Sequence, residues 1–272
     1  MQRATGASYL WRSIRYLGGR YLLRRPFMVA SGDSGRRFKF KTEDVVGRLI
    51  FKRAVFEEEL GELVLGSVKL SDGDVAVDVG ANLGWYSVLL DRLADGTNAT
   101  VLSFEPDPLN FELLAHNAKL NGATHLHLVR KAVSDRPGVA RLYRYASKNL
   151  GRHSLLPINE DTGIEVETVT LDGYLAGLQI APGRVRFVKI DVEGLEFEVL
   201  RGMTRVLEAR PLVVAEFSPK YMRGAGIAIR DFVTFLESRG YRPHRVGSRG
   251  LIPIDARELE DSVASENLIW QA

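Results

Sequence analysis

The clearest chemical signal lies in the stretch VAVDVGANLGWYSVLL, residues 75–90. Asp78 follows an apolar run, Gly80 and Gly84 come next, and apolar residues then resume at helical spacing. A junction of this kind, between a strand and a helix, leaves the backbone open to a ligand. Asp78 can accept hydrogen bonds from an ammonium or a hydroxyl group, and the glycines allow the backbone to approach closely.

The glycine spacing indicates which ligand this junction binds. A nicotinamide-binding turn reads G-x-G-x-x-G, whereas this chain has Gly80, Asn82 and Trp85 at those three positions. Trp85 would stand where the helix must lie against the strand, and no Lys-Ser or Lys-Thr pair follows to form a phosphate loop. The ligand therefore carries positive charge near the loop and no phosphate. S-adenosyl-L-methionine, with a sulfonium, an amino acid end and an adenosine, has this character.

A second acidic residue supports an adenosine ligand. Glu105 lies 25 residues beyond Gly80, at the end of the next predicted strand, where a carboxylate can bind ribose hydroxyls. The adjacent Asp107 fits the N-cap of the following helix, so Glu105 is not needed there. Asn110, one turn into that helix, either holds the loop or ligand or packs at the edge of the core. The residues expected to bind the cofactor are Asp78, Gly80, Ala81, Asn82, Gly84, Glu105, Pro106, Asn110, Ala132, Val133 and Asp191.

Methyl transfer from a sulfonium is an in-line displacement, so the protein must position an acceptor oxygen and accept its proton. Asp191 ends a further predicted strand and shares a strand face with Lys189, which would keep it ionised. Asp191 is therefore a candidate catalytic residue, and Glu193 and Glu216 are expected to bind the acceptor. The alternative is that Asp191 and Glu193 only cap the helix that begins near Gly194.

Two other features bear on the chemistry. His153 is the second candidate base, because an unperturbed imidazole pKa of about 6.5 suits proton removal; otherwise it lies in a solvated loop. Asp191, Glu193 and Glu216 together could hold Mg²⁺. Carboxylates at strand ends more often bind substrate hydroxyls or helix amides, so we expect no metal.

The elements that position these residues alternate between strand and helix patterns. Strands are predicted at 75–79, 100–106, 125–133, 185–191, 212–217, 241–246 and 266–272, the last two as an antiparallel closing pair. Helices are predicted at 84–94, 108–122, 195–207 and 229–239. Runs 139–145 and 164–171 predict an inserted hairpin. The alternation implies an α/β fold with a mostly parallel, doubly wound sheet, and the ligand lies at the carboxyl ends of its strands.

The segments DVGANLGWYS, FEPDP, KAVSD and VKIDVEGLEFEVLRG resemble the FkbM-type S-adenosylmethionine-dependent methyltransferases over roughly residues 70–220. The resemblance implies a Rossmann-like class I methyltransferase with a seven-stranded sheet and helices on both faces. It also implies transfer to a hydroxyl of a polyketide, sugar or glycan-like natural product.

Composition narrows the class of protein further. The 272 residues contain no cysteine, which removes disulfides, thiolate zinc sites, iron–sulfur clusters and a cysteine nucleophile. No apolar run reaches the length of a transmembrane span, so we expect a cytoplasmic enzyme.

Charge is distributed unevenly along the chain. Residues 1–41 hold 10 Lys and Arg against Asp33 alone, a net charge of +9, and the remainder carries −6. The acidic remainder argues against a nucleic-acid partner. The stretch YLWRSIRYLGGRYLLRR is an imperfect basic amphipathic pattern. It predicts a helix that packs on the body or on a second copy, a peripheral membrane contact, or a cleaved targeting segment.

We therefore expect a basic, helical N-terminal extension over 1–66, with a loop around 32–41 and a helix over 54–66, and a methyltransferase domain over 67–272. The expected function is metal-independent O-methylation of a small-molecule or glycan acceptor. The alternatives are a non-catalytic cofactor-binding or membrane-associated scaffold and, disfavoured by Asn82 and Trp85, a nicotinamide oxidoreductase.

Overall fold

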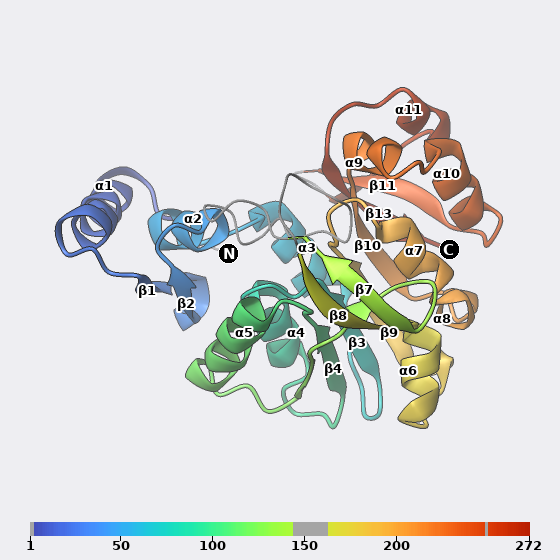
Figure 1. Ribbon diagram of the computed structural model, residues 1–272, viewed down its shortest axis with the longest axis horizontal. Coiled ribbons are helices and arrows are strands. Elements are labelled where there is room, and N and C mark those ends of the chain that lie inside the picture. Colours follow the sequence, from blue (N-terminus) through green and yellow to red (C-terminus); the bar gives the residue numbers. More distant parts are fainter. Residues whose placement is uncertain (1–2, 144–162, 248–249) are drawn as a thin grey trace.

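A twisted sheet runs through the middle of the molecule (Figure 1). In the computed structural model, which describes residues 3–143, 163–247 and 250–272, eight strands form it in the order β12-β11-β13-β10-β9-β3-β4-β5. Their bounds are β3 (Val75–Val79), β4 (Thr100–Phe104), β5 (Leu126–Val129), β9 (Val185–Ile190), β10 (Leu212–Phe217), β11 (Arg242–Gly247), β12 (Gly250–Pro253) and β13 (Glu266–Gln271).

The sheet is mostly parallel, as predicted. Strands β10, β9, β3, β4 and β5 are parallel to one another. The predicted closing pair is also confirmed, because β13 is antiparallel to both β10 and β11. Beyond the seven predicted strands, β12 pairs with β11 at the edge of the sheet.

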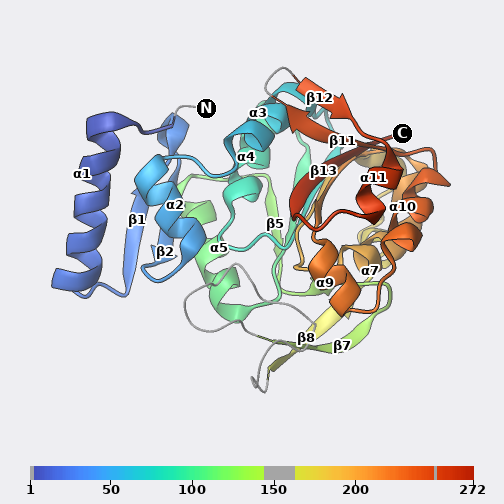
Figure 2. The ribbon, with the colours of Figure 1, turned by 90° about the horizontal axis from the view of Figure 1, so that it is seen from above.

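Helices cover both faces of the sheet, which confirms the doubly wound architecture (Figure 2). All five residues of β3 are buried, and successive residues serve opposite cores: Val75 and Val77 belong to one apolar cluster and Ala76 to the other. On the face of Ala76 lie α3 (Glu58–Ser67), α4 (Trp85–Leu93) and α5 (Pro108–Leu120). The opposite face carries α6 (Leu171–Gly177), α7 (Glu196–Arg201), α8 (Thr204–Glu208), α9 (Pro219–Gly224), α10 (Ile229–Glu237) and α11 (Ala256–Glu260).

The inserted hairpin is confirmed and belongs to a small separate sheet. β7 (Gly138–Leu142) is antiparallel to β8 (Ile164–Val169), which also pairs in parallel with β6 (Ala132–Val133). The single strand predicted over 125–133 is therefore wrong. The chain leaves the central sheet after β5, and β8 satisfies the backbone of β6 in place of β4.

The helix predicted over 195–207 is also wrong in one respect, because it is broken into α7 and α8. A Cβ atom at Gly202 would lie 2.0 Å from the carbonyl oxygen of Ser134, so the chain between the helices passes directly against the end of β6. Met203, with φ −131°, leaves helical geometry there. Tertiary contact interrupts a helix whose apolar periodicity continues.

The N-terminal extension is helical except for a hairpin. Its elements are α1 (Gly6–Leu17), the π-helical turn η1 (Gly18–Leu22), β1 (Phe27–Ser31), the 3₁₀ turn η2 (Asp33–Gly35), β2 (Arg37–Lys41) and α2 (Val45–Arg53). The loop predicted around 32–41 is confirmed for residues 32–36, which connect the two strands, and wrong for Arg37–Lys41, because β2 pairs along its whole length with β1. Within RFKFK, Phe38 and Phe40 are fully buried on one side, a two-residue alternation typical of a strand. The predicted helix over 54–66 is α3, which begins at Glu58.

The extension packs against the rest of the chain and shares its core. The side-chain amide of Asn117 in α5 accepts from the Lys39 amide at 2.7 Å and donates to the Lys39 carbonyl at 3.0 Å. The ring of Phe38 lies 5.1 Å from that of Trp85 in α4. The outer part of the extension, α1, lies at one end of the longest axis of the molecule (Figure 1).

Candidate active site

Two glycines shape the turn between β3 and α4. Gly80 has φ +82°, and a Cβ atom there would lie 1.9 Å from the carbonyl oxygen of Asp191. Gly84 has φ +93°, and its Cβ would meet Leu114 Cδ1 of α5 at 2.7 Å. Both positions therefore require glycine because protein atoms, rather than ligand atoms, approach them closely.

A first cavity of about 720 Å³ opens at the carboxyl ends of β3, β4 and β9. This is where a doubly wound sheet binds its ligand. Eight of the predicted cofactor residues line it, namely Gly80, Asn82, Glu105, Pro106, Asn110, Ala132, Val133 and Asp191. The sequence analysis missed the other lining residues, which adjoin the same strand ends: Val79, Phe104, Lys131, Ser134, Leu142, Val192, Leu195 and Glu198.

Glu105 is buried on the wall of this cavity. Its two carboxylate oxygens accept hydrogen bonds from the amides of Asn82 (2.8 Å) and Asp107 (2.9 Å). Burial raises the pKa of Glu105 to about 8, although both amides favour the charged form. A carboxylate has further lone pairs, so Glu105 keeps the capacity to accept from two ribose hydroxyls. Asp107 caps α5 as predicted, by accepting from the Leu109 amide at 2.8 Å.

Three of the predicted cofactor residues lie elsewhere. Asp78 is buried under α4, where it accepts from the Ser87 hydroxyl at 2.6 Å, and burial raises its pKa against the opposing charge of Lys189. Asp78 and Ala81 line a second cavity instead of the first. Gly84 lines neither cavity, consistent with its role in packing α4 against α5.

The second cavity, of about 850 Å³, meets the first at Gly80, Asn82 and Asp191, which line both. Its remaining wall joins the strand ends to the N-terminal extension. These further lining residues are Val45, Val46, Phe56, Glu57, Asp78, Ala81, Leu83, Trp85, Tyr86, Lys189, Glu193 and Glu216. Asp191 therefore lies at the junction, while both predicted acceptor residues line the second cavity.

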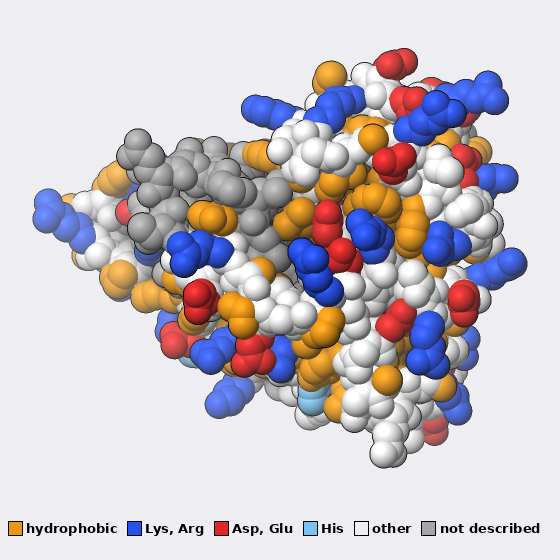
Figure 3. Space-filling view, turned by 45° about the vertical axis from the view of Figure 1, so that its right-hand side comes forward, with side chains coloured by type: hydrophobic (Ala, Val, Ile, Leu, Met, Phe, Trp, Pro, Cys, Tyr) orange, Lys and Arg blue, Asp and Glu red, His pale blue; other side chains and the backbone are white. Residues whose placement is uncertain are grey.

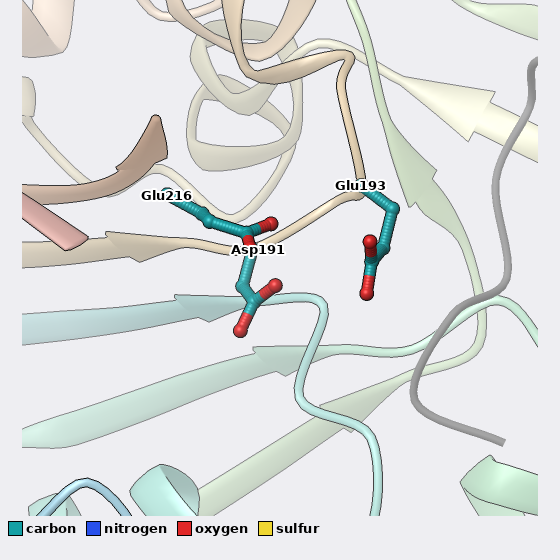
Figure 4. A group of neighbouring side chains, drawn as sticks. All are labelled: Asp191, Glu193 and Glu216. Carbon is teal, nitrogen blue, oxygen red and sulfur yellow. The ribbon is translucent and has the colours of Figure 1, made fainter. Parts of the chain in front are cut away.

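Asp191, Glu193 and Glu216 form a carboxylate cluster at this junction (Figure 4). One oxygen from each lies within 4.8 Å of the other two. The Lys189 ammonium, which is 2% exposed, donates to Asp191 Oδ2 at 2.8 Å, as the shared strand face predicted. Burial lowers the pKa of Lys189, but attraction to Asp191, Glu57 and Asp78 outweighs it, so the pKa is raised and Lys189 stays charged.

Glu216 lies beside the two other carboxyl groups of the cluster. Burial, followed by repulsion from Asp191 and Glu193, raises the pKa of Glu216 to about 9. The raised pKa favours the protonated form of Glu216, which can donate a hydrogen bond as well as accept one.

Glu196 supports the loop after β9 and was missed in the sequence analysis. Its buried carboxylate accepts from the amides of Val192 and Gly194, both at 3.1 Å, and burial raises its pKa to about 7. α7 has no side-chain cap hydrogen bond at its N-cap, Leu195. The amides of Val192 and Gly194 ahead of α7 are thus bound by Glu196, and the alternative that Asp191 or Glu193 caps this helix stays a prediction.

Glu57 was also missed, because its partners are remote in sequence. It has φ +47° and accepts from the Tyr86 hydroxyl at 2.7 Å and from Asn267 Nδ2 at 2.9 Å. These bonds tie the extension to α4 and to β13 beside the second cavity. His153, the second candidate base, lies outside the described residues.

The strand order places β5, β4, β3, β9 and β10 side by side, and the cavities open where the order reverses, between β3 and β9. This arrangement defines a Rossmann-like, cofactor-binding enzyme fold. The model of the methyltransferase FkbM domain matches residues 78–243, which is more than half of the chain. The chain belongs to this family and is an S-adenosyl-L-methionine-dependent methyltransferase.

The individual relatives have low sequence identity to this chain. Hexuronic acid methyltransferase AglP of Haloferax volcanii is 27% identical over 214 residues, covering 79% of this chain and 81% of that protein. The 31-O-demethyl-FK506 methyltransferase FkbM of Streptomyces tacrolimicus is 33% identical over 165 residues, covering 50% of this chain and 62% of that protein. Among solved structures, the FkbM methyltransferase of Methylobacillus flagellatus KT superposes with a TM-score of 0.46 at 18% identity, covering 76% of this chain and 45% of that one.

Proposed function

We propose that this methyltransferase acts on a hydroxyl oxygen of a sugar, glycan or polyketide-like natural product. The observation that carries the proposal is that the two cavities meet at Asp191. Eight predicted cofactor residues line one side of the junction, and carboxylates suited to binding hydroxyls line the other. The name of one relative, a 31-O-demethyl-FK506 methyltransferase, supports transfer to an oxygen of a natural product, and that of the hexuronic acid methyltransferase supports a sugar-derived acceptor without saying which group is methylated.

The first cavity fits the cofactor. Glu105 would bind the ribose hydroxyls, and Gly80 and Asn82 line the cavity beside it. The cofactor, when bound, supplies a methyl group on a positively charged sulfonium. Asp191 would accept a hydrogen bond from the acceptor hydroxyl, orient its oxygen, and take up its proton as the bond to carbon forms. Lys189 would fix the Asp191 carboxylate by the 2.8 Å ion pair.

The electrostatics of the second cavity favour a neutral hydroxyl. Among the described residues, the lining of this cavity has one ammonium group, Lys189, against five carboxyl groups, those of Glu57, Asp78, Asp191, Glu193 and Glu216. Such a lining disfavours an acceptor carboxylate, whereas a hydroxyl would find several acceptors here and a donor in the protonated form of Glu216. Phe56, which is partly exposed, lines the same cavity and offers an apolar surface for a sugar ring.

We propose that the chemistry needs no metal. The spacing of the three carboxylates could accommodate a divalent cation. Lys189 already places a positive charge 2.8 Å from Asp191 and so supplies the local charge compensation that a cation would give.

The proposal also includes a contact made by the N-terminal extension. Within the described residues, none of the helices combines the length and the apolar character needed to cross a membrane. We propose a peripheral contact, with a membrane or with a second copy of the chain, through the N-terminal extension.

The chemistry can be tested with methyl-labelled S-adenosylmethionine and a panel of neutral sugars, hexuronic acids, oligosaccharides and hydroxylated polyketides. We expect label in a product that survives mild base, as a methyl ether does and a methyl ester does not. Label in a base-labile ester would instead identify a carboxylate acceptor, and label on nitrogen or carbon would refute O-methylation. Asp191→Asn is the matched control for enzyme-dependent transfer.

A further inference from the structure

Helix α1 turns its polar side toward the protein. The Arg12 guanidinium donates through Nη1 to the carbonyl oxygens of Ser31 and Phe51, each at 2.9 Å. Tyr16, which is 2% exposed, donates its hydroxyl to the carbonyl oxygen of Thr42. These bonds fix the rotation of the helix about its own axis and so decide which residues face outward.

The π-helical turn η1 continues this arrangement. Gly19 is buried against β1, where a Cβ atom would lie 2.7 Å from Met28 Sδ, near the end of that side chain. Arg20 donates through Nη1 to the Tyr16 hydroxyl at 3.0 Å. The side of α1 and η1 that packs on the body therefore combines Arg12, Arg20 and Gly19 with the ring of Tyr16, which lies 6.0 Å from that of Phe51.

The outward side carries an apolar face. Its members recur at helical spacing, and we call them the N-terminal apolar face: Leu10, Trp11, Ile14, Leu17, Tyr21 and Leu22. Their exposed fractions run from 47% at Leu17 to 83% at Leu22. An amphipathic helix on a protein surface normally buries its apolar side, and here the orientation is reversed. A contiguous apolar surface of this kind marks an interaction site.

Cations flank this apolar face. The Arg15 guanidinium carbon lies 4.5 Å from the centre of the Trp11 ring, and that of Arg20 lies 5.1 Å from the centre of the Tyr21 ring. Residues 1–41 carry a net charge of +9, against −6 for the rest of the chain. Figure 3 shows apolar and basic side chains next to one another at the end of the molecule that α1 occupies. Tryptophan and tyrosine beside arginine are typical of the membrane interface, where rings and cations lie at the headgroups.

We propose that the N-terminal apolar face docks on an anionic lipid membrane. The apolar side chains would enter the boundary between headgroups and acyl chains, and the neighbouring arginines would contact lipid phosphates. A second copy of the chain is the weaker partner, because a two-fold contact would bring Arg15 and Arg20 of both copies together. The acidic remainder would be repelled by the same membrane, so the enzyme would bind with α1 toward the lipid.

This inference rests on the peripheral contact proposed above and is independent of the acceptor, because lipid binding is measured without methyl transfer. The test is cosedimentation of the full chain with vesicles of phosphatidylcholine, with and without phosphatidylglycerol. We expect binding to the anionic vesicles that weakens as salt is raised. Trp11→Ser combined with Ile14→Ser should reduce the fraction bound at least roughly tenfold. Arg15→Gln should reduce the affinity roughly fivefold.

Val263→Ser is the matched control, because Val263 is an apolar residue that is 81% exposed outside the N-terminal extension. It should bind vesicles like the wild type, and calorimetry with S-adenosylmethionine should show that every variant still folds. Absence of binding to anionic vesicles by the wild type would overturn the proposal. So would a wild-type dimer, seen in sedimentation, that Trp11→Ser and Ile14→Ser convert to a monomer without any change in vesicle binding.

Discussion

The two cavities at the strand ends are built from different parts of the chain. Every residue that lines the first cavity lies between Val79 and Glu198, inside the range matched by the family model. The second cavity is also lined by Val45, Val46, Phe56 and Glu57, which belong to the extension and lie outside that range. On the proposed assignment of the two cavities, the cofactor would be bound by the domain that the family model covers, and the acceptor would also contact a segment outside it.

The junction itself should give the largest effect. Asp191→Asn keeps the shape of the side chain and removes the charge that orients the acceptor and accepts its proton. We expect kcat to fall by roughly 10²- to 10⁴-fold with little change in cofactor affinity. Stopped-time assays and calorimetry on the same preparation separate the two quantities. Wild-type turnover in this variant would leave Asp191 as the partner of Lys189 only and pass the base role to His153 or to water.

Glu105→Ala tests the first cavity alone. The variant loses the hydrogen bonds to the ribose, each worth about 0.5–3 kcal/mol depending on the charge of Glu105, so the cofactor Kd should rise by about 2- to 200-fold. Turnover at saturating cofactor should survive, because Glu105 does not line the second cavity. Glu105→Gln, which can still accept one of the two backbone hydrogen bonds, controls for local unfolding. An unchanged Kd in both variants would contradict the ribose assignment.

Glu57→Gln tests the second cavity alone. The change weakens the bonds to Tyr86 and Asn267, each at the scale of about 1 kcal/mol, and the acceptor KM should rise roughly 3- to 10-fold. The cofactor Kd should stay the same. Glu59→Gln, at an exposed position of the same segment, is the matched control. A rise in the cofactor Kd would show that the two cavities are not separable.

Glu216→Gln should change stability with pH. The folded-state pKa of about 9 lies above that of an unfolded glutamate, so folding binds a proton between these values and the stability of the wild type falls as pH rises through this window. The glutamine variant lacks this loss, so its stability relative to the wild type should rise between pH 4 and pH 9. Denaturant titrations at both pH values measure the difference. Equal pH dependence in the two proteins would mean that Glu216 is ionised.

Metal removal should give the smallest effect. Because Lys189 compensates the charge of Asp191, treatment with a chelator should leave turnover within about twofold of the untreated enzyme. Assays with added Mg²⁺ complete the comparison. Loss of activity on chelation that Mg²⁺ restores would assign a metal to the carboxylate cluster.

The cofactor side of the site was largely readable from residue patterns. The buried run VAVDV predicted β3 at its observed bounds, and the spacing of Gly80 and Glu105 predicted a cofactor that the family match supports. Both signals are local, because they concern the end of one strand and the start of the next helix. The binding roles of the individual residues stay predictions.

The sequence by itself determined the doubly wound sheet and its inserted hairpin, because period-2 and period-3.6 patterns report burial along each element. The spacing of Gly80 and Glu105 indicated the cofactor. The sequence did not determine where tertiary contacts override these patterns. The break between α7 and α8 at Gly202 is one such place, because the carbonyl of Ser134, from a distant segment, lies directly against it. The joining of Glu57 to Asn267, 210 residues away, is of the same kind. The outward rotation of α1 also required the tertiary structure, since Arg12 and Tyr16 fix it by hydrogen bonds to backbone carbonyls that only the folded hairpin and α2 bring within reach.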